Sequence, residues 1–127
     1  MKSHFTVSLA VLAGVGIGAV AVQSLHAQSK PPVYFVGEND VSNPDAYAKE
    51  FLPLIKESIK ASGGRYVAAG KATTLEGEPP ASRVVVIAFD SLEKIQAWRG
   101  SQAFKDDRKI GDKYAKFRAY AIDGIPQ

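Results

Sequence analysis

The hydrophobic and polar positions after residue 30 follow two different periods, which predict strands and helices in turn. Short runs rich in β-branched and aromatic residues predict strands at 33–36, 65–69, 83–89 and 119–122. Between the first two strands, apolar positions recur at spacings of three and four, which is typical of one face of a helix. They are Ala48, Leu52, Ile55 and Ile59, and Ser62 continues the same face.

Local signals indicate where this first helix begins, bends and ends. Asn43 before Pro44 predicts its start, because Asn caps helices and Pro fits the first helical position. Pro53 predicts a kink within 48–53, since its ring meets the carbonyl four residues earlier. The pair Gly63–Gly64 could cradle a phosphate, but a glycine pair between a helix and a strand favours a left-handed helix stop.

The second helical region is predicted to have two segments. Asp90 with Glu93 fits a capping box at its start, and Gly100 followed by Ser101 predicts a break and a new cap. The second segment then carries an apolar stripe, predicted to be Ala103, Ile110, Tyr114 and Phe117.

The resulting order is strand, helix, strand, strand, helix, strand, which predicts a ferredoxin-like α+β fold with an antiparallel sheet and helices on one face. Strand 83–89 does not alternate, so both of its faces are expected to be buried. An apolar sheet face left in water is unusual for a soluble monomer. We therefore expect a second copy to cover it in a two-fold homodimer.

The first 27 residues have the pattern of a secretory signal. Lys2 is followed by an uncharged, mostly apolar run at 5–22, and a polar stretch then ends in the small residue Ala27. An uncleaved anchor is the alternative, because 18 residues approach spanning length. Three glycines in the run and no basic cluster after it favour cleavage. We expect a domain at 28–127 that is periplasmic or secreted, with no stable membrane association.

Composition excludes several kinds of chemistry. The sequence has no Cys, and its two His, His4 and His26, both fall in the predicted signal. Thiolate nucleophiles, Cys-built zinc sites and His-based triads are therefore excluded from the domain. We expect no metal and no cofactor. Without Lys2 the charge is 15 basic against 13 acidic residues, or +2, and no strand has a basic-Gly-aromatic signature, so nucleic acid is not an expected partner.

Several short motifs, in order along the chain, resemble the pattern of the domain of unknown function 1330 family. They are Gly63-Gly64-Arg65-Tyr66, Leu75-Glu76-Gly77, the run 83–91, Ala97-Trp98 with Ser101, Arg108, and Asp123-Gly124. The resemblance spans about residues 33–124 and implies a dimeric α+β barrel, in which two ferredoxin-like sheets close face to face. It supplies no reaction. Phe104 stands where the family often has Tyr.

Five residues are candidates for a ligand site, each with a simpler structural interpretation beside it. Trp98 could stack on an aromatic ligand or fill the core, and Arg108 could bind an acidic group or pair with Asp112 on the surface. Tyr34 or Tyr66 would supply the strand side of the cavity, and Asp123 is either a polar site residue or part of a turn.

Two functions remain open at this point. The first is binding of a small apolar or aromatic, weakly acidic compound in a cavity between helices and sheet. The second is a cofactor-independent oxygenase or isomerase acting on such a compound. A carboxyl group beside the cavity would favour catalysis, whereas apolar and Tyr atoms alone would favour binding.

Overall fold

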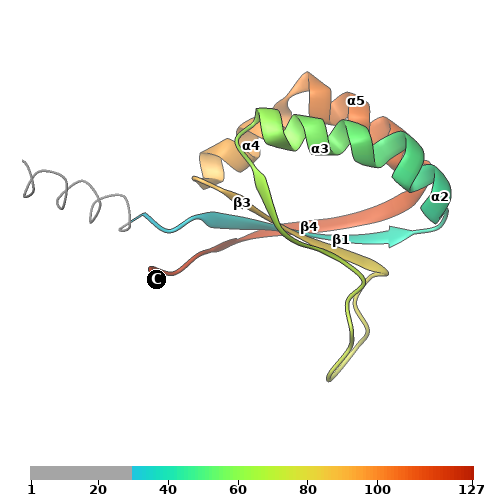
Figure 1. Ribbon diagram of the computed structural model, residues 1–127, viewed down its shortest axis with the longest axis horizontal. Coiled ribbons are helices and arrows are strands. Elements are labelled where there is room, and N and C mark those ends of the chain that lie inside the picture. Colours follow the sequence, from blue (N-terminus) through green and yellow to red (C-terminus); the bar gives the residue numbers. More distant parts are fainter. Residues whose placement is uncertain (1–29) are drawn as a thin grey trace, which may run out of the picture. The chain divides into compact units, whose positions relative to one another are not determined.

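A four-stranded antiparallel sheet forms one layer of the protein, and the helices lie together on one of its faces (Figure 1). The computed structural model describes residues 30–127, so the predicted signal segment lies outside the described residues. The strands are β1 (Val33–Val41), β2 (Arg65–Gly70), β3 (Arg83–Phe89) and β4 (Ala115–Asp123), in the sheet order β2-β3-β1-β4. This arrangement confirms the predicted ferredoxin-like α+β fold.

The first helical region contains a π-helical turn where a kink was predicted. It consists of α2 (Pro44–Ala46), the turn η1 (Tyr47–Phe51) and α3 (Leu52–Ala61). The Leu52 N–H donates to the Tyr47 carbonyl, five residues back, one residue before Pro53, which has no N–H. The wider turn shifts the buried face, so Tyr47 and Phe51 are buried while Ala48, predicted on that face, is exposed.

Glycines and serines end and start the helices. Gly63 has a φ of +85°, and the Gly64 N–H donates to the Ile59 carbonyl at 2.9 Å, which confirms the left-handed stop. The capping box at Asp90 is wrong. Ser91 caps α4 (Leu92–Gly100), because its extended backbone lets Oγ accept the Lys94 N–H at 3.2 Å. Ser101 caps α5 (Gln102–Gly111) as predicted.

Two strands are longer than predicted. β1 continues past residue 36 to Val41, and β4 begins at Ala115 instead of 119. Tyr114 and Phe117 were predicted on a helical stripe, but α5 ends at Gly111, so Phe117 lies on β4. A side chain at Gly111 would come within 2.7 Å of Phe51 Cε1, which shows how closely the end of this helix packs on the core.

The core lies between the helices and the sheet, and within residues 30–127 no helix lies on the other face of the sheet (Figure 1). Val85, Ile87 and Phe89 of β3 are buried toward the helices, whereas Val84 and Val86 on the opposite face are half-buried. Ala88 on that opposite face is 1% exposed, so within a single chain the second face of β3 is buried only in part. No helix within residues 30–127 has the length and apolar character to cross a membrane.

Candidate functional site

A small cavity of about 40 Å³ lies between the helices and the sheet. Its walls are mostly aromatic and aliphatic, and its polar lining groups come from arginine, tyrosine and asparagine. The residues used below are Asn39, Tyr47, Tyr66, Trp98, Arg99 and Arg108. These six residues come from five elements spread over the domain, so the site exists only in the folded protein.

Trp98 forms one wall of the cavity and is also a core residue. It is 2% exposed, and its ring packs edge-on against Phe35 and Phe104 with centroids 5.2 and 4.9 Å away. Its Nε1–H donates to Ser58 Oγ at 3.1 Å. The ring is thus fixed on its apolar and its polar side, which confirms the core interpretation of Trp98, and the same ring also lines the cavity.

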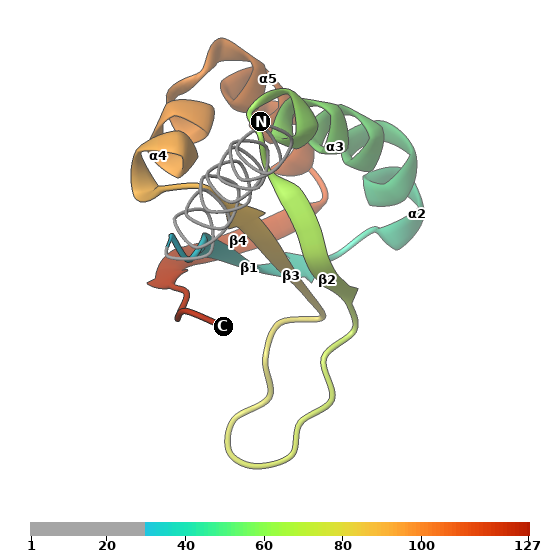
Figure 2. The same cartoon turned by 60° about the vertical axis from the view of Figure 1, so that its left-hand side comes forward.

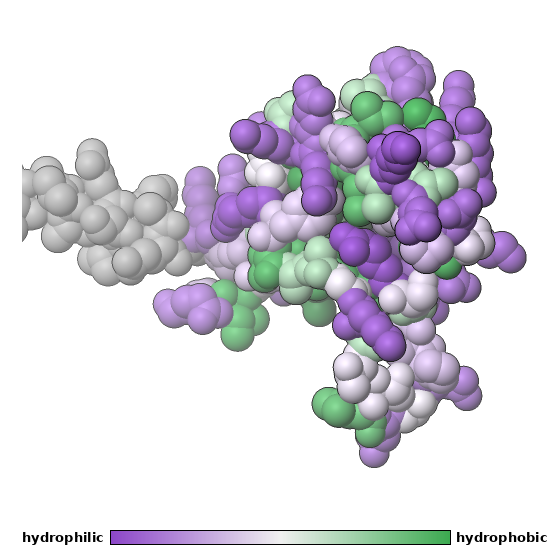
Figure 3. Space-filling view, turned by 45° about the vertical axis from the view of Figure 1, so that its right-hand side comes forward, coloured by the Kyte–Doolittle hydropathy of each residue, from purple (hydrophilic) through white to green (hydrophobic). Residues whose placement is uncertain are grey.

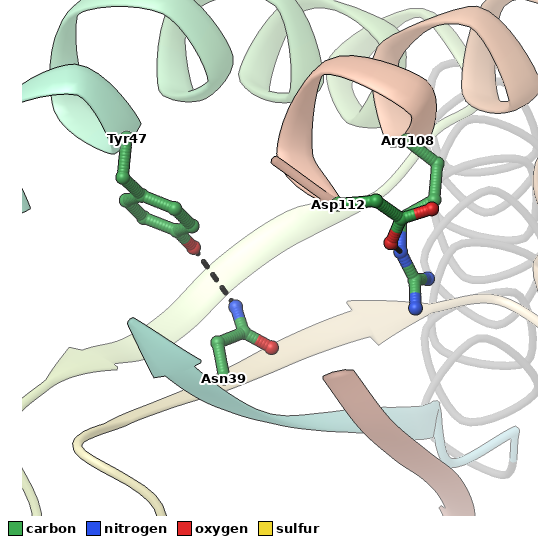
Figure 4. A network of polar contacts seen from close by, with 4 residues as sticks. All are labelled: Asn39, Tyr47, Arg108 and Asp112. Atoms are coloured by element: carbon green, nitrogen blue, oxygen red, sulfur yellow. Dashed lines mark hydrogen bonds and ion pairs between the residues drawn. The ribbon is translucent and has the colours of Figure 1, made fainter. Parts of the chain in front are cut away.

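Arg108 reaches the cavity while keeping its surface partner. Its Nε donates to Asp112 Oδ1 at 3.0 Å, and its guanidinium carbon lies 3.8 Å from the centroid of the Phe117 ring. Figure 4 shows the Arg108 side chain directed from the helix toward the sheet, with Asp112 beside it. Arg108 thus forms the ion pair with Asp112 and also lines the cavity.

Arg99 is a second cation at the same cavity, and the sequence reasoning missed it. Its guanidinium carbon lies 5.0 Å from the Phe104 ring and 5.9 Å from the Phe35 ring. Burial, followed by the positive charge of Arg108, lowers the pKa of Arg99. Within the described part of the chain the ion pairs join Arg108 to Asp112 and Arg118 to Glu38, so Arg99 has no carboxylate partner there.

The phenols of Tyr66 and Tyr47 lie toward the β2 and β1 side of the cavity. Burial is the main cause that raises the pKa of Tyr66, so at neutral pH its hydroxyl is a hydrogen-bond donor and not a base. Tyr47 is 3% exposed, and its hydroxyl accepts from Asn39 Nδ2 at 2.9 Å (Figure 4). Asn39 and Tyr47 were not predicted, although Asn39 follows Phe35 and Gly37 at the spacing of one strand face.

The structure does not bring Tyr34 and Asp123 to this cavity. Tyr34 neighbours the core residue Phe35 on β1, so it points to the opposite face of the sheet, and Tyr66 alone supplies the strand-side phenol. Asp123 is exposed at the end of β4, next to Gly124, whose N–H donates to the Pro32 carbonyl at 2.8 Å. This is the turn position that was the simpler interpretation of Asp123.

Carboxylates are absent from the lining of this cavity in the described residues. Residues 30–127 also contain no cluster of three or more His, Asp or Glu side chains placed to hold a metal ion. What the cavity offers is therefore an aromatic wall, the guanidinium groups of Arg99 and Arg108, and neutral phenol and amide donors. Arg118 also lines the cavity, but its guanidinium pairs with Glu38.

These features define an α+β domain of ferredoxin-like fold with a polar-tipped, aromatic cavity between its helices and its sheet. The family model described as "Domain of unknown function (DUF1330)" matches residues 32–125, and the chain belongs to this family. The family predicted from the sequence motifs is thereby confirmed. No curated protein matches the sequence.

Solved structures share this fold at low sequence identity. The methylated RPA0582 protein aligns with a TM-score of 0.62 and 13% identity, covering 80% of this chain and 90% of that one. A second structure of the RPA0582 protein, from Rhodopseudomonas palustris, also shares the fold. SnoaB, a cofactor-independent oxygenase from Streptomyces nogalater, aligns at 0.57 and 10% identity, covering 76% and 96%. A dimeric ferredoxin-like protein of unknown function from Thermobifida fusca aligns at 0.54 and 14%, covering 73% and 91%.

Proposed function

We propose that this protein is an exported homodimer that binds a small aromatic, weakly acidic compound in the cavity between its helices and its sheet. The observation that carries the proposal is the pair Arg99 and Arg108, two guanidinium groups at one aromatic-walled cavity that has no carboxylate in its described lining. Guanidinium groups bind carboxylate or phenolate oxygens in a forked geometry, and Trp98 offers an aromatic surface beside them.

The size of the cavity requires that it open when a ligand binds. About 40 Å³ accommodates very few atoms, whereas cavities for drug-sized ligands measure roughly 300–1,000 Å³. Arg99 is an exposed residue whose long side chain lies over Phe104, and Arg108 lies likewise over Phe117. Their movement would open the cavity and leave both charges free to close on the ligand, while Trp98 stays fixed by Ser58.

The lining favours binding over catalysis. A general base near neutral pH needs a carboxyl group, a histidine or a group with a suitably shifted pKa, and the raised pKa of Tyr66 moves its phenol away from that role. The similarity to SnoaB, which is named a cofactor-independent oxygenase, keeps oxygenation as the second candidate. If the protein consumes O₂ in the presence of an aromatic acid, oxygenation would replace binding as the proposed function.

Fluorescence of Trp98, the one Trp in the sequence, provides the test. Salicylate is a small aromatic acid that accepts energy from tryptophan, and salicylamide has nearly the same shape without the carboxylate. We expect salicylate to quench Trp98 more strongly than salicylamide at pH 7. Arg99→Gln should weaken salicylate binding by about tenfold or more, the range for a lost hydrogen bond to a charged group, and leave salicylamide nearly unchanged.

Arg65→Gln is the matched control, because Arg65 is an exposed arginine of β2 outside the cavity lining. Equal affinity of the wild-type protein for salicylate and salicylamide would contradict the role of the arginines. An equal loss in the Arg65 and Arg99 variants would reduce the effect to general surface charge, and the proposed site would fail.

Export and dimerisation are separate parts of the proposal. The signal pattern of residues 1–27 supports export. The uncovered sheet face supports a second copy, since Tyr120 and Ile122 on that face are 49% and 57% exposed in the single chain. The similarity to the dimeric ferredoxin-like protein from Thermobifida fusca also supports this part of the proposal.

A further inference from the structure

A long connection between β2 and β3, residues 71–82, extends from the sheet on the side away from the helices (Figures 1 and 2). We call these residues the β2–β3 arm. Connections of this length without helix or strand are uncommon in compact domains and usually serve a function. The ligand cavity has no residue of the arm in its lining, so the proposed ligand site does not explain it.

Polar contacts and prolines hold the base of the arm in place. Ser82 Oγ accepts the Val41 N–H at 2.9 Å and donates to the Asn39 carbonyl at 3.2 Å, which fastens the arm to the end of β1. Pro79 and Pro80 fix the backbone on the same side of the arm. The entropy lost when the arm contacts a partner is reduced by this stiffening.

The arm carries the most exposed large hydrophobic side chain of the described residues. Leu75 is 94% exposed, compared with 39% for Leu54 and 44% for Leu92 on the helices. Figure 3 shows hydrophobic surface near the far end of the arm, next to weakly polar residues and to strongly hydrophilic ones at the tip. A single exposed leucine is ordinary on a protein surface, so the position of the arm beside the uncovered sheet face is what points to a contact with another molecule.

The occupant that fits is a second copy of this chain. The arm extends on the same side as the uncovered sheet face, so a second subunit that packs on that face would lie beside the arm (Figure 1). The charges favour this contact as well: the arm carries Glu76 and Glu78 against a single Lys71, and Lys116 lies on the uncovered side of β4 beside Arg118, which pairs with Glu38. In a two-fold dimer each arm meets the other subunit, so every such contact occurs twice.

We infer that the β2–β3 arm is a clasp that holds the second subunit, with Leu75 as its apolar anchor. This inference rests on the homodimer proposed above and adds which segment stabilises it. A two-fold dimer would bury Leu75 of both arms, so a substitution at this position changes two contacts and affects the dissociation free energy twice.

Sedimentation equilibrium of the purified protein without its signal tests the clasp. We expect a dimer at micromolar concentration, and Leu75→Ser should raise its dissociation constant by about tenfold or more. Leu92→Ser is the control, because Leu92 is an exposed leucine at the start of α4, and its dissociation constant should match that of the wild type. Tyr120→Asp places a charge on the uncovered sheet face and should also weaken the dimer.

The outcomes separate the clasp from the dimer. A wild-type monomer at these concentrations would overturn the proposed homodimer and the clasp with it. A wild-type dimer that Tyr120→Asp weakens and Leu75→Ser leaves unchanged would overturn the clasp alone. Because the sequence has no Cys, Leu75→Cys can carry a single environment-sensitive dye, whose emission should shift to the red on dilution to monomer if Leu75 is buried in the dimer.

Discussion

Replacing Arg108 with Ala separates the structural contribution of this side chain from its proposed contribution to binding. The ion pair with Asp112 is worth about 0.3–0.5 kcal/mol, because Asp112 is 61% exposed and solvent screens the pair. The contact with the Phe117 ring at 3.8 Å adds about 0.5–1 kcal/mol. Arg108→Ala should therefore lower the free energy of unfolding by roughly 0.8–1.5 kcal/mol.

The effect on binding is expected to be larger than the effect on folding. Loss of a hydrogen bond to a charged group costs about 1.5–3 kcal/mol, which corresponds to a loss of roughly 10- to 150-fold in salicylate affinity. Asp112→Ala removes the ion pair and leaves the guanidinium in place. It should cost less than about 0.5 kcal/mol in stability and leave salicylate affinity the same or slightly higher.

Urea unfolding and the Trp98 fluorescence titration measure the two quantities on the same samples. If Arg108→Ala and Asp112→Ala change both quantities to the same small extent, Arg108 is only the surface partner of Asp112. If Arg108→Ala instead unfolds the domain, the stability estimate is wrong, and the assignment of Arg108 as a ligand residue has no support.

Three further predictions concern pH, packing and processing. Burial raises the pKa of Asp107, so the folded state holds this proton to higher pH than the unfolded state, and the contribution of Asp107 to stability falls as the pH rises above about 4. Asp107→Asn should thus be more stable than the wild type in urea at pH 7 and lose that advantage near pH 3; an equal gain at both would refute this. Gly64→Ala places a Cβ within 2.7 Å of Phe89 Cζ and should cost about 1–3 kcal/mol in a thermal melt, whereas Gly100→Ala has open space and should be neutral or slightly stabilising. Intact mass of the protein from the cell envelope should correspond to a chain that begins near Gln28; a mass that includes Met1 would contradict cleavage.

The parts of the fold that the sequence predicted depend on near neighbours in the chain. The turn at Gly63, the cap at Ser101 and the strand 83–89 each follow from a few adjacent residues. The cavity wall at Trp98 and the position of Arg108 were also correctly expected to approach one cavity.

The parts that were missed depend on contacts between distant residues. The predicted end of β1 was too early because Glu38 and Asn39 are residue types common in loops. In the fold, Glu38 is buried and accepts a hydrogen bond from Arg118, 80 positions away. Asn39 is likewise buried and donates to the phenol oxygen of Tyr47. Arg99 showed no signal in the sequence, since an exposed arginine on a helix is common and only the fold places it beside Phe104. The direction of the β2–β3 arm likewise follows from the fold and from no local pattern.

The indole N–H of Trp98 gives the most direct test of the ligand site. The sequence has one Trp, so a ¹⁵N-labelled sample shows a single indole signal, and this N–H is bonded to Ser58 Oγ beside the cavity. On titration with salicylate, we predict that the indole signal moves in step with the backbone signals of Tyr66 and Arg108 and saturates with them, and that Arg99→Gln reduces the affinity reported by all three. An indole signal that stays in place while salicylate saturates other parts of the surface would contradict a ligand site in this cavity.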